Sequence, residues 1–346
     1  MKYYNQPAKT LLVGFSLLLA FSCLSGCQKT IKQNSTTIRI GIALYQQDDT
    51  FITTLAQNLE QMAKEEEQAR DIKLNLNITD SRSSQAAQNE QVDRFLSQGY
   101  DVICINIVDR TAAAVIIDKA QAAGVPVIFF NREPVEEDML RWEGAYYVGS
   151  QATQSGILQG HIVLDAWRKD SSVIDRNGDG IVQYVMLEGE PGHQDALLRT
   201  EYSVKVLTNA DIPTEKLASD TADWQRGQAG ALIRQWRTHY GEQIEVIFAN
   251  NDDMALGAID VYTEAGIKPE DLPFIVGVDA TPPALEAIES GTLKGTVVND
   301  AAGQARSVLD LACSLALGED PSATVALQKG NYIWLPCTTI TKDKLE

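Results

Sequence analysis

Basic residues are in short supply in this 346-residue chain, and the shortage argues against nucleic-acid binding. The sequence holds 29 lysines and arginines against 47 aspartates and glutamates, which gives a formal net charge of −18. Such a chain lacks the positive field that attracts phosphate backbones, so nucleic acid is not an expected partner. A DNA-binding repressor would also begin with a helix-turn-helix segment, which we do not expect at the start of this chain.

Cysteine is scarce as well, with five residues and no CxxC pair. Cys104, Cys313 and Cys337 lie far apart, and Cys104 belongs to the apolar run 102–108, where we expect it to fill the core. We therefore expect neither a disulfide framework nor a thiolate metal site. The rest of the composition is ordinary, since 44% hydrophobic and 22% charged residues over this length predict about two folded domains.

Long apolar runs are absent apart from residues 10–24, which follow Lys2 and Lys9. Fifteen residues are too few to cross a hydrocarbon core of about 30 Å, but they suit a secretory signal. The next string, Leu24-Ser25-Gly26-Cys27, resembles the lipobox of bacterial lipoproteins. We therefore expect an extracytoplasmic protein anchored to the membrane by lipid, with an ordinary signal and an incidental cysteine as the alternative.

By this resemblance residues 1–26 form the signal peptide, and Cys27 is lipidated and becomes the mature N-terminus. A diacylglyceryl-type anchor supplies the two acyl chains that stable attachment needs. The polar composition of residues 27–37 suits a flexible tether between the lipid and the folded part.

Strands and helices alternate beyond the tether, at the spacing of βαβ units. In a first series we expect strands at 38–44, 74–80, 102–108 and 125–131, and helices at 51–67, 84–97 and 111–123. In a second series we expect strands at 182–187, 245–249, 274–278 and 295–298, and helices from 195 and at 224–236, 254–265 and 282–289. A helix at 301–317 and a strand near 332 follow. The pattern predicts an α/β fold of doubly wound parallel sheets, in which ligands bind beyond the carboxyl ends of the strands.

Polar residues stand at the ends of several predicted strands. They are Asp48, Asp49, Asn131, Asn251, Asp252, Asp279, Asn299 and Asp300. One such residue is most simply a helix N-cap, but their recurrence in both series favours a binding site. Asp, Asn and Arg side chains satisfy the hydroxyls of a sugar, and aromatic rings cover its C–H faces. Phe51 and Trp224 suit the aromatic role, with burial in the core as the alternative for each.

Seven strings carry a specific resemblance to a known family. They are YQQDDTF at 45–51, FNREP at 130–134, GEPGHQD at 189–195, DTADW at 220–224, ANND at 249–252, GVD at 277–279 and GTVVND at 295–300. With Arg199, they make residues 38–343 resemble the periplasmic galactose/glucose-binding proteins, type I periplasmic sugar-binding proteins of ABC importers. The departures are Gln194, where the pattern often has proline, and the lipid anchor.

The resemblance implies ten residues that bind D-galactose or D-glucose. Phe51 and Trp224 sandwich the sugar ring. The others hydrogen-bond its hydroxyls and ring oxygen, and they are Asp49, Asn131, His193, Asp195, Arg199, Asn251, Asp279 and Asn299. The loop 192–195, which contains His193, follows a strand and opens a helix, whose N-terminus favours a polar ligand group. A surface or core histidine is the alternative for His193.

The resemblance also implies two lobes joined by a three-strand hinge, with crossings near Ser150, Asn299 and Leu335. The first lobe then comprises residues 38–149 and 299–334, and the second comprises residues 150–298 and 335–346. Sugar closes the lobes, and we expect the closed monomer to deliver it to the permease of an ABC importer in the cytoplasmic membrane. The alternative function is that of a sugar sensor, which presents its liganded form to a membrane signalling receptor. A glycoside-processing enzyme is the weaker alternative, because nothing selects Asp195 and Asp279 as acid and base over the other carboxylates.

A second motif is independent of the sugar residues. The string DRNGDGIVQ at 175–183 places oxygen ligands at alternate positions with glycine at the sixth, which is the spacing of an EF-hand calcium loop. The twelfth position is Met186, so the usual bidentate glutamate is missing, and by resemblance Glu245 replaces it. The loop runs into a strand, which excludes a helix-loop-helix switch. We expect one structural calcium, with a solvated turn as the alternative; the ligands are Asp175, Asn177, Asp179, Ile181, Gln183 and Glu245.

Overall fold

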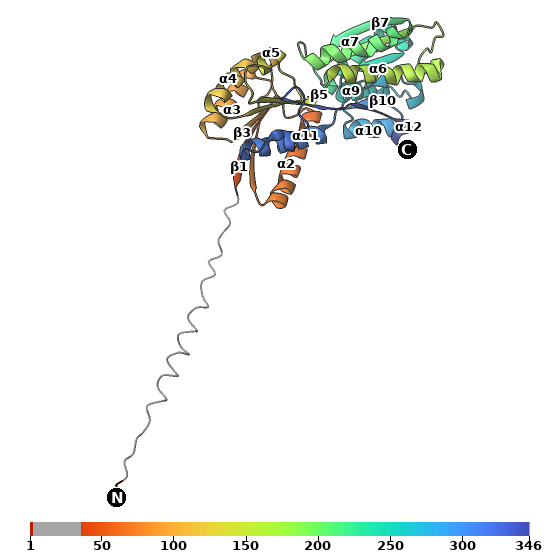
Figure 1. Ribbon diagram of the computed structural model, residues 1–346. Coiled ribbons are helices and arrows are strands. Elements are labelled where there is room, and N and C mark those ends of the chain that lie inside the picture. Colours follow the sequence, from red (N-terminus) through yellow and green to blue (C-terminus); the bar gives the residue numbers. More distant parts are fainter. Residues whose placement is uncertain (3–35, 346) are drawn as a thin grey trace. The chain divides into compact units, whose positions relative to one another are not determined.

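The computed structural model describes residues 1–2 and 36–345, and Figure 1 shows their secondary structure. From Thr37 onward the chain forms one compact unit. The predicted signal peptide, apart from its first two residues, lies outside the described residues. The predicted lipidation site at Cys27 lies outside them as well. Within the described part, none of the helices combines the length and the apolar character that a membrane span requires.

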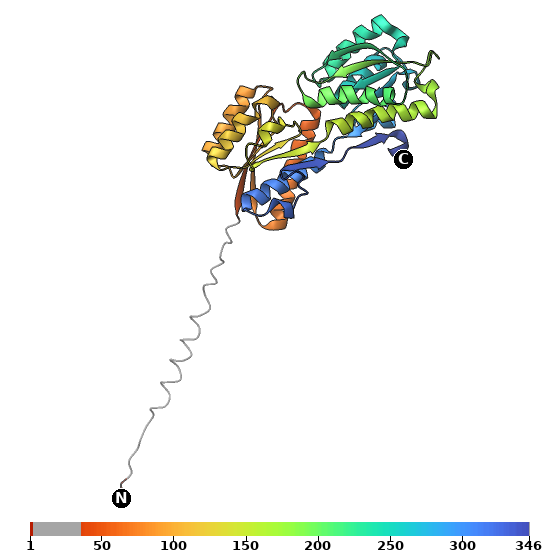
Figure 2. The same cartoon turned by 45° about the horizontal axis from the view of Figure 1, so that its top comes forward.

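The first sheet has six parallel strands in the order β11-β5-β4-β3-β1-β2. Their bounds are β1 (Thr37–Leu44), β2 (Lys73–Asp80), β3 (Val102–Ile105), β4 (Val127–Phe130), β5 (Ala145–Ser150) and β11 (Tyr332–Leu335). One face of this sheet packs against α2 (Thr50–Arg70) and α11 (Ala301–Leu317), and the other against α3 (Gln85–Ser97) and α4 (Ala113–Ala123). Helix α11 lies beside α2 in both views (Figures 1 and 2).

The inner strands of this sheet, β1, β3, β4 and β5, are mostly apolar, as expected for strands whose two faces are both covered. Ile38, Ile40 and Ile42 of β1 point to the core under α2 and α11, whereas Ala43 points to the core under α3 and α4. The alternation of side chains along a strand produces this division. Cys104 of β3 is fully buried in the first of these cores, as expected of a filler residue.

The second sheet has the order β12-β10-β9-β8-β6-β7, and its edge strand β12 is antiparallel to β10. Its strands are β6 (Val182–Glu188), β7 (Thr214–Thr221), β8 (Val246–Ala249), β9 (Phe274–Val276), β10 (Gly295–Val298) and β12 (Thr338–Thr341). One face carries α6 (Ala152–Lys169) and α7 (Gln194–Asn209). The other face carries α8 (Arg226–Tyr240), α9 (Asp252–Glu264) and α10 (Pro282–Glu289).

Short helices complete the described elements: α5 (Glu136–Met139), α12 (Lys342–Leu345), η1 (Arg110–Ala112), η2 (Ser171–Val173), η3 (Gly241–Gln243), η4 (Pro269–Asp271) and η5 (Pro321–Ala323). The chain passes between the two sheets three times: from β5 to α6, from β10 to α11, and from β11 to β12. The predicted fold of two α/β lobes is therefore confirmed, and we call the lobes built on the first and second sheets the first and second lobe.

Two glycines let α6 approach α7, the helix that carries two predicted ligand residues. A Cβ atom on Gly160 would lie 2.3 Å from the carbonyl oxygen of Ser203, and one on Gly156 would lie 3.0 Å from Cα of Arg199. Side chains at these positions would push α7 outward. The absence of a Cβ in α6 therefore helps to fix where Asp195 and Arg199 lie.

Candidate ligand-binding site

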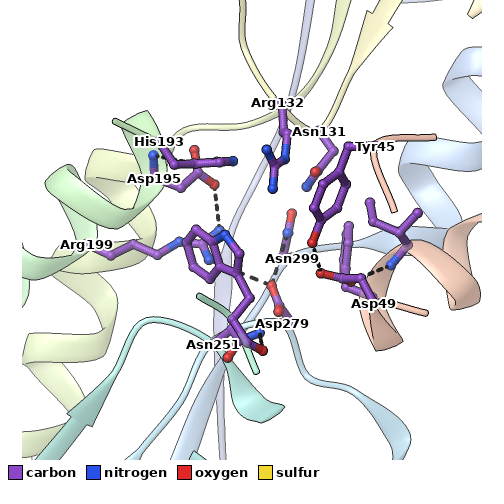
Figure 3. A pocket seen from close by; sticks show the side chains of 13 residues that line it. Tyr45, Asp49, Asn131, Arg132, His193, Asp195, Arg199, Asn251, Asp279 and Asn299 are labelled. Carbon is purple, nitrogen blue, oxygen red and sulfur yellow. Dashed lines mark hydrogen bonds and ion pairs between the residues drawn. The ribbon is translucent and has the colours of Figure 1, made fainter. Parts of the chain in front are cut away.

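All ten residues predicted to bind sugar line one pocket, although they are distributed over both lobes (Figure 3). Asp49, Phe51 and Asn131 belong to the first lobe, and Asn299 lies in the connection from β10 to α11. The second lobe supplies the other six: His193, Asp195, Arg199, Trp224, Asn251 and Asp279. The site is therefore formed by the carboxyl ends of strands from two separate sheets, as expected for doubly wound folds.

Asp49 is held by the start of α2 and by a tyrosine. It is the N-cap residue of the helix, and its Oδ1 accepts a hydrogen bond from the backbone N–H of Ile52 at 2.9 Å. Its Oδ2 accepts a second bond from the Tyr45 hydroxyl at 2.6 Å. Asp49 is therefore both a helix N-cap and a pocket residue, because capping fixes a carboxylate that still lines the pocket.

Asn131 follows β4 in a left-handed backbone conformation, with φ of 61°. Its Oδ1 accepts a hydrogen bond from Nδ2 of buried Asn106 at 3.1 Å, and its backbone carbonyl accepts one from the Tyr147 hydroxyl at 2.9 Å. Trp224 and Asp279 also have positive φ angles, of 64° and 121°. Such conformations are costly for residues other than glycine, and they concentrate at functional sites.

His193 is the N-cap residue of α7, and its Nδ1 accepts a hydrogen bond from the backbone N–H of Asp195 at 3.1 Å. Burial lowers the pKa of His193 well below its usual value, and the positive charges of Arg132 and Arg199 lower it further. The imidazole is therefore neutral near neutral pH, so Nδ1 accepts a hydrogen bond while Nε2 carries a proton that a ligand oxygen can accept.

Arg199 is the most highly connected side chain of the pocket. Its guanidinium donates to Asp195 Oδ2 at 2.8 Å, to the carbonyl oxygen of Asn250 at 2.9 Å and to the Ser155 hydroxyl at 3.2 Å, and it lies 3.9 Å from Asp279 Oδ1. The side chains of this ion pair with Asp195 are only 5% and 11% exposed. A charge so well hydrogen-bonded has a fixed geometry and needs no reorganisation when a ligand arrives.

Asp279 and Asn299 line the pocket and are joined by a chain of hydrogen bonds. Asn299 Nδ2 donates to Asp279 Oδ1 at 3.1 Å, and Gln304 Nε2 in turn donates to Asn299 Oδ1 at 2.7 Å. Burial raises the pKa of Asp279 and of Asp195, although the Arg199 guanidinium opposes the rise at both. These carboxylates thus combine low exposure with free oxygen lone pairs, which is suitable for accepting ligand hydroxyls.

Trp224 and Phe51 are the two aromatic residues among the ten. The Trp224 indole packs against Gly189, where a Cβ atom would lie 2.2 Å from the ring, and it contacts the His193 ring edge-on at 5.0 Å. Asn251 caps α9 through its Oδ1 and donates from Nδ2 to the backbone carbonyl of Trp224 at 3.2 Å. The loop that carries the tryptophan is therefore tied to a strand end.

Three residues of the pocket were not predicted: Tyr45, Ile52 and Arg132. Tyr45 and Arg132 each belong to one of the strings that carry the family resemblance, and the signal that marks them is their position within two residues of a strand end. Three polar strand-end residues lie outside the pocket. Asp48 is largely exposed, Asp300 caps α11, and Asp252 is buried against Thr281 and Thr296.

The predicted calcium loop is a tight turn ordered by its own acidic residues. Asp175 accepts hydrogen bonds from the N–H groups of Gly178, Asp179 and Gly180 at 2.8–3.0 Å. Asp179 Oδ2 accepts bonds from Gln183 Nε2 and Asn177 Nδ2, and Glu245, 1% exposed, accepts one from the N–H of Arg176. The predicted ligands are therefore adjacent, although in the described chain no three His, Cys, Asp or Glu side chains converge as a metal-holding group.

Comparison with known proteins gives matches along nearly the whole described chain. Residues 40–320 match a family model described as a periplasmic binding protein domain. The chain is 40% identical over 309 residues to a D-galactose/methyl-galactoside binding periplasmic protein of Haemophilus influenzae, covering 89% of this chain and 90% of the relative. It is 34% identical over 307 residues to a putative rhizopine-binding protein of Rhizobium meliloti, with 88% and 91% covered.

A solved structure shows the same architecture. The chain aligns with an ABC transporter solute binding protein from Bacillus halodurans with bound myo-inositol, at a TM-score of 0.73 and 30% sequence identity. The alignment covers 90% of this chain and 97% of that structure. The alignment thus extends over both lobes.

Proposed function

Since the chain belongs to the periplasmic binding protein family, we propose that it binds D-galactose or D-glucose between its two lobes and delivers the sugar to an ABC importer. The observation that carries the proposal is the convergence of all ten predicted ligand residues in one pocket. The relative named for D-galactose and methyl-galactoside, at 40% identity, supports the choice of sugar. The relatives named for rhizopine and myo-inositol are the reason for testing other cyclic polyols as well.

The chemistry of the pocket supports a pyranose. Its lining combines a carboxylate and an amide from the first lobe with two carboxylates, an amide, a neutral imidazole and a guanidinium from the second, so each hydroxyl can both donate and accept. Phe51 and Trp224 offer apolar surfaces for the C–H faces of the ring. A ligand that touches both lobes stabilises the closed form over the open form, and only this difference in affinity shifts the equilibrium between them.

Titration calorimetry on the folded protein tests the ligand. D-galactose or D-glucose should bind, and ribose, arabinose and disaccharides should bind much more weakly. At a sugar concentration 100 times the Kd, the free energy of unfolding should rise by about 2.7 kcal/mol through mass action. Tighter binding of ribose, or of a cyclic polyol such as myo-inositol, than of both hexoses would contradict the assignment.

We also propose that the protein acts outside the cytoplasm as a monomer attached to the membrane through lipid on Cys27. The motivation is the lipobox-like string behind the apolar run 10–24. Membrane fractionation of cells that express Cys27→Ser tests this part, since the variant should be released from the membrane fraction. A variant that stays with the membrane would point to another mode of attachment.

One structural calcium is proposed for the loop 175–183 together with Glu245. The donor set fits calcium, because it consists of carboxylate, amide and carbonyl oxygens, and Glu245 is a buried carboxylate whose pKa burial raises. When bound, the ion would supply positive charge to Asp175, Asp179 and Glu245. Glu245 starts the segment that leads into β8, so the ion would fasten the loop to the second sheet.

Removal of calcium should lower the melting temperature and leave sugar affinity nearly unchanged, because no loop residue lines the ligand pocket. Calcium at 100 times its Kd would contribute about 2.7 kcal/mol to stability. Scanning calorimetry with and without a chelator measures this, and Asp179→Asn should abolish the difference. Glu286→Ala, which removes an exposed carboxylate of α10, is the control and should keep it. If the melting temperature of the parent protein changes with neither chelator nor added calcium, the proposal is overturned.

A further inference from the structure

Among the described residues, two side-chain hydrogen bonds join the first lobe directly to the second. Arg132, which follows β4, pairs with Glu190, which follows β6, at 2.7 Å between Nη2 and Oε2. Thr50, at the start of α2, donates from Oγ1 to Asp253 Oδ2 of α9 at 2.6 Å. Glu190 does not line the ligand pocket, whereas Arg132 does. The first contact therefore links the pocket wall of one lobe to the other lobe without requiring a ligand.

Arg132 is held in place on three sides. Its side chain is 5% exposed, and its Nη1 donates to the backbone carbonyl of Val108 at 3.1 Å within its own lobe. Its guanidinium carbon lies 3.5 Å above the centre of the Tyr45 ring. A buried cation held by a ring face and one carbonyl is short of negative charge, and Glu190 is the carboxylate that supplies it.

The same tyrosine connects this cation to the ligand residues. The Tyr45 hydroxyl donates to Asp49 Oδ2 at 2.6 Å, so Glu190, Arg132, Tyr45 and Asp49 form a continuous series of contacts. This series starts in the second lobe and ends on a residue predicted to bind a sugar hydroxyl. Formation of the ion pair therefore also fixes the ring that orients Asp49.

The nearby Arg110 is not an equivalent partner for Glu190. Its guanidinium donates to the carbonyl oxygens of Glu133 and Pro134 at 3.0 and 3.3 Å, both in the first lobe. Of these two arginines, Arg132 is therefore the one that forms an ion pair with the other lobe. The neutral donor Thr50 makes the second contact, and a hydrogen bond from a neutral donor is weaker than a charge-assisted pair.

We propose that Arg132 and Glu190 form a latch between the lobes, which stabilises the closed form and lengthens the lifetime of bound sugar. The effect on the lifetime of bound sugar rests on the proposed function, whereas the effect on the closed form does not. In the open form Glu190 is solvated, and Arg132 keeps only its contacts within the first lobe. The pair therefore favours the closed form specifically, and Glu190 is a positioning residue that acts through Arg132.

The first test uses the protein without sugar. Spin labels at the exposed helical positions Gln121 of α4 and Thr208 of α7 report the distribution of distances between the lobes. The parent should show a closed population that Glu190→Gln loses. Coinciding distributions for parent and variant would overturn the latch. Because no ligand is involved, this arm stands whether or not the proposed sugar binds.

The second test measures association and dissociation rates of D-galactose by stopped-flow fluorescence. Glu190→Gln should raise the dissociation rate about 10-fold and change the association rate by less than about 2-fold, because a partly exposed charge pair of the closed form is lost. The matched control is Glu201→Gln, which breaks an exposed pair with Lys205 inside α7 and should change neither rate. Equal dissociation rates for Glu190→Gln and the parent, or an effect confined to association, would contradict the latch.

Ionic strength supplies an independent measurement, because the sugar carries no charge. Raising ionic strength from about 0.01 M to about 1 M shortens the Debye length from about 30 Å to about 3 Å and weakens a partly exposed ion pair. The affinity of the parent should fall over this range, and that of Glu190→Gln should change less. If parent and variant respond identically, the salt effect arises elsewhere and the latch is refuted. A parent that binds no hexose at all would instead contradict the proposed function.

Discussion

Replacing Arg199 by methionine should abolish detectable sugar binding and lower the free energy of unfolding by about 3–5 kcal/mol. The guanidinium is the cation that holds Asp195 at 2.8 Å and lies 3.9 Å from Asp279, and all three side chains are nearly inaccessible to solvent. Methionine fills a similar volume but leaves both carboxylates buried without a positive partner. They would then take up protons or draw in water, and the fixed set of acceptors in the pocket would be lost.

The matched control for this substitution is Arg226→Met. Arg226 pairs with Asp260 at 2.6 Å, but both side chains are more than 40% exposed. Exposed pairs contribute about 0–1 kcal/mol, so the control should bind sugar normally and lose little stability. Urea unfolding and calorimetry on the two variants decide the matter. If Arg199→Met binds a hexose with the affinity of the parent, the proposed ligand set is wrong.

The second large effect concerns Asp252 and pH. This first residue of α9 is completely buried, and its carboxylate accepts hydrogen bonds from the Thr281 N–H at 2.9 Å and the Thr296 hydroxyl at 2.7 Å. Burial raises the pKa of Asp252 to about 7, although these hydrogen bonds oppose the rise. In the unfolded chain the pKa is about 3.9. Between these two values the folded protein holds a proton that the unfolded chain releases.

Stability contributed by protonated Asp252 is therefore fully present below pH of about 4 and is lost as pH rises through about 7. A pKa difference of about 3 corresponds to at most about 4 kcal/mol over this window. Asp252→Asn keeps the shape and removes the titration, so its free energy of unfolding should decrease less with pH than that of the parent. Urea unfolding at pH values from about 4 to about 8 measures both slopes. Parallel curves would contradict a raised pKa at this site.

Several apolar strands of the fold were predictable because they are buried on both faces, although β5, which is also largely buried, was not predicted. The runs that became β1, β3 and β4 consist almost entirely of buried side chains, and the expected bounds of β1 differ by one residue at its start. The predictions that the chain belongs to the periplasmic binding protein family, has two α/β lobes and is a binding protein and not an enzyme are confirmed by the family match and by the names of its relatives.

Elements that lack this pattern were missed. Strand β7 has the sequence TEKLASDT and lies at the edge of its sheet with no buried residue, so hydrophobic periodicity gives no signal. Helix α6 includes Gly156 and Gly160, which weaken helix propensity and are explained only by the approach of α7. The antiparallel direction of β12 depends on the last crossing of the chain, which local sequence does not determine.

The residues of the candidate pocket could be named more completely than the elements of the fold. Polar residues at the carboxyl ends of parallel strands converge whatever the intervening helices do, and this pattern marks Asp49, Asn131, Asn251, Asp279 and Asn299. The other five residues were assigned to the site through the family resemblance. Tyr45 and Arg132 were missed because each resembles a core or surface residue when it is taken alone. Their role depends on contacts between the lobes, and no pattern within a single segment records these.

A crystal structure of the complex with D-galactose is the most direct test of whether these ten residues form one sugar site. We expect the ring between Phe51 and Trp224, with hydroxyls within hydrogen-bond distance of Asp49 and Asn131 on one side and of Asp195 and Arg199 on the other. A sugar bound outside this pocket, or one that contacts a single lobe only, would show that the ten residues do not form a shared sugar site.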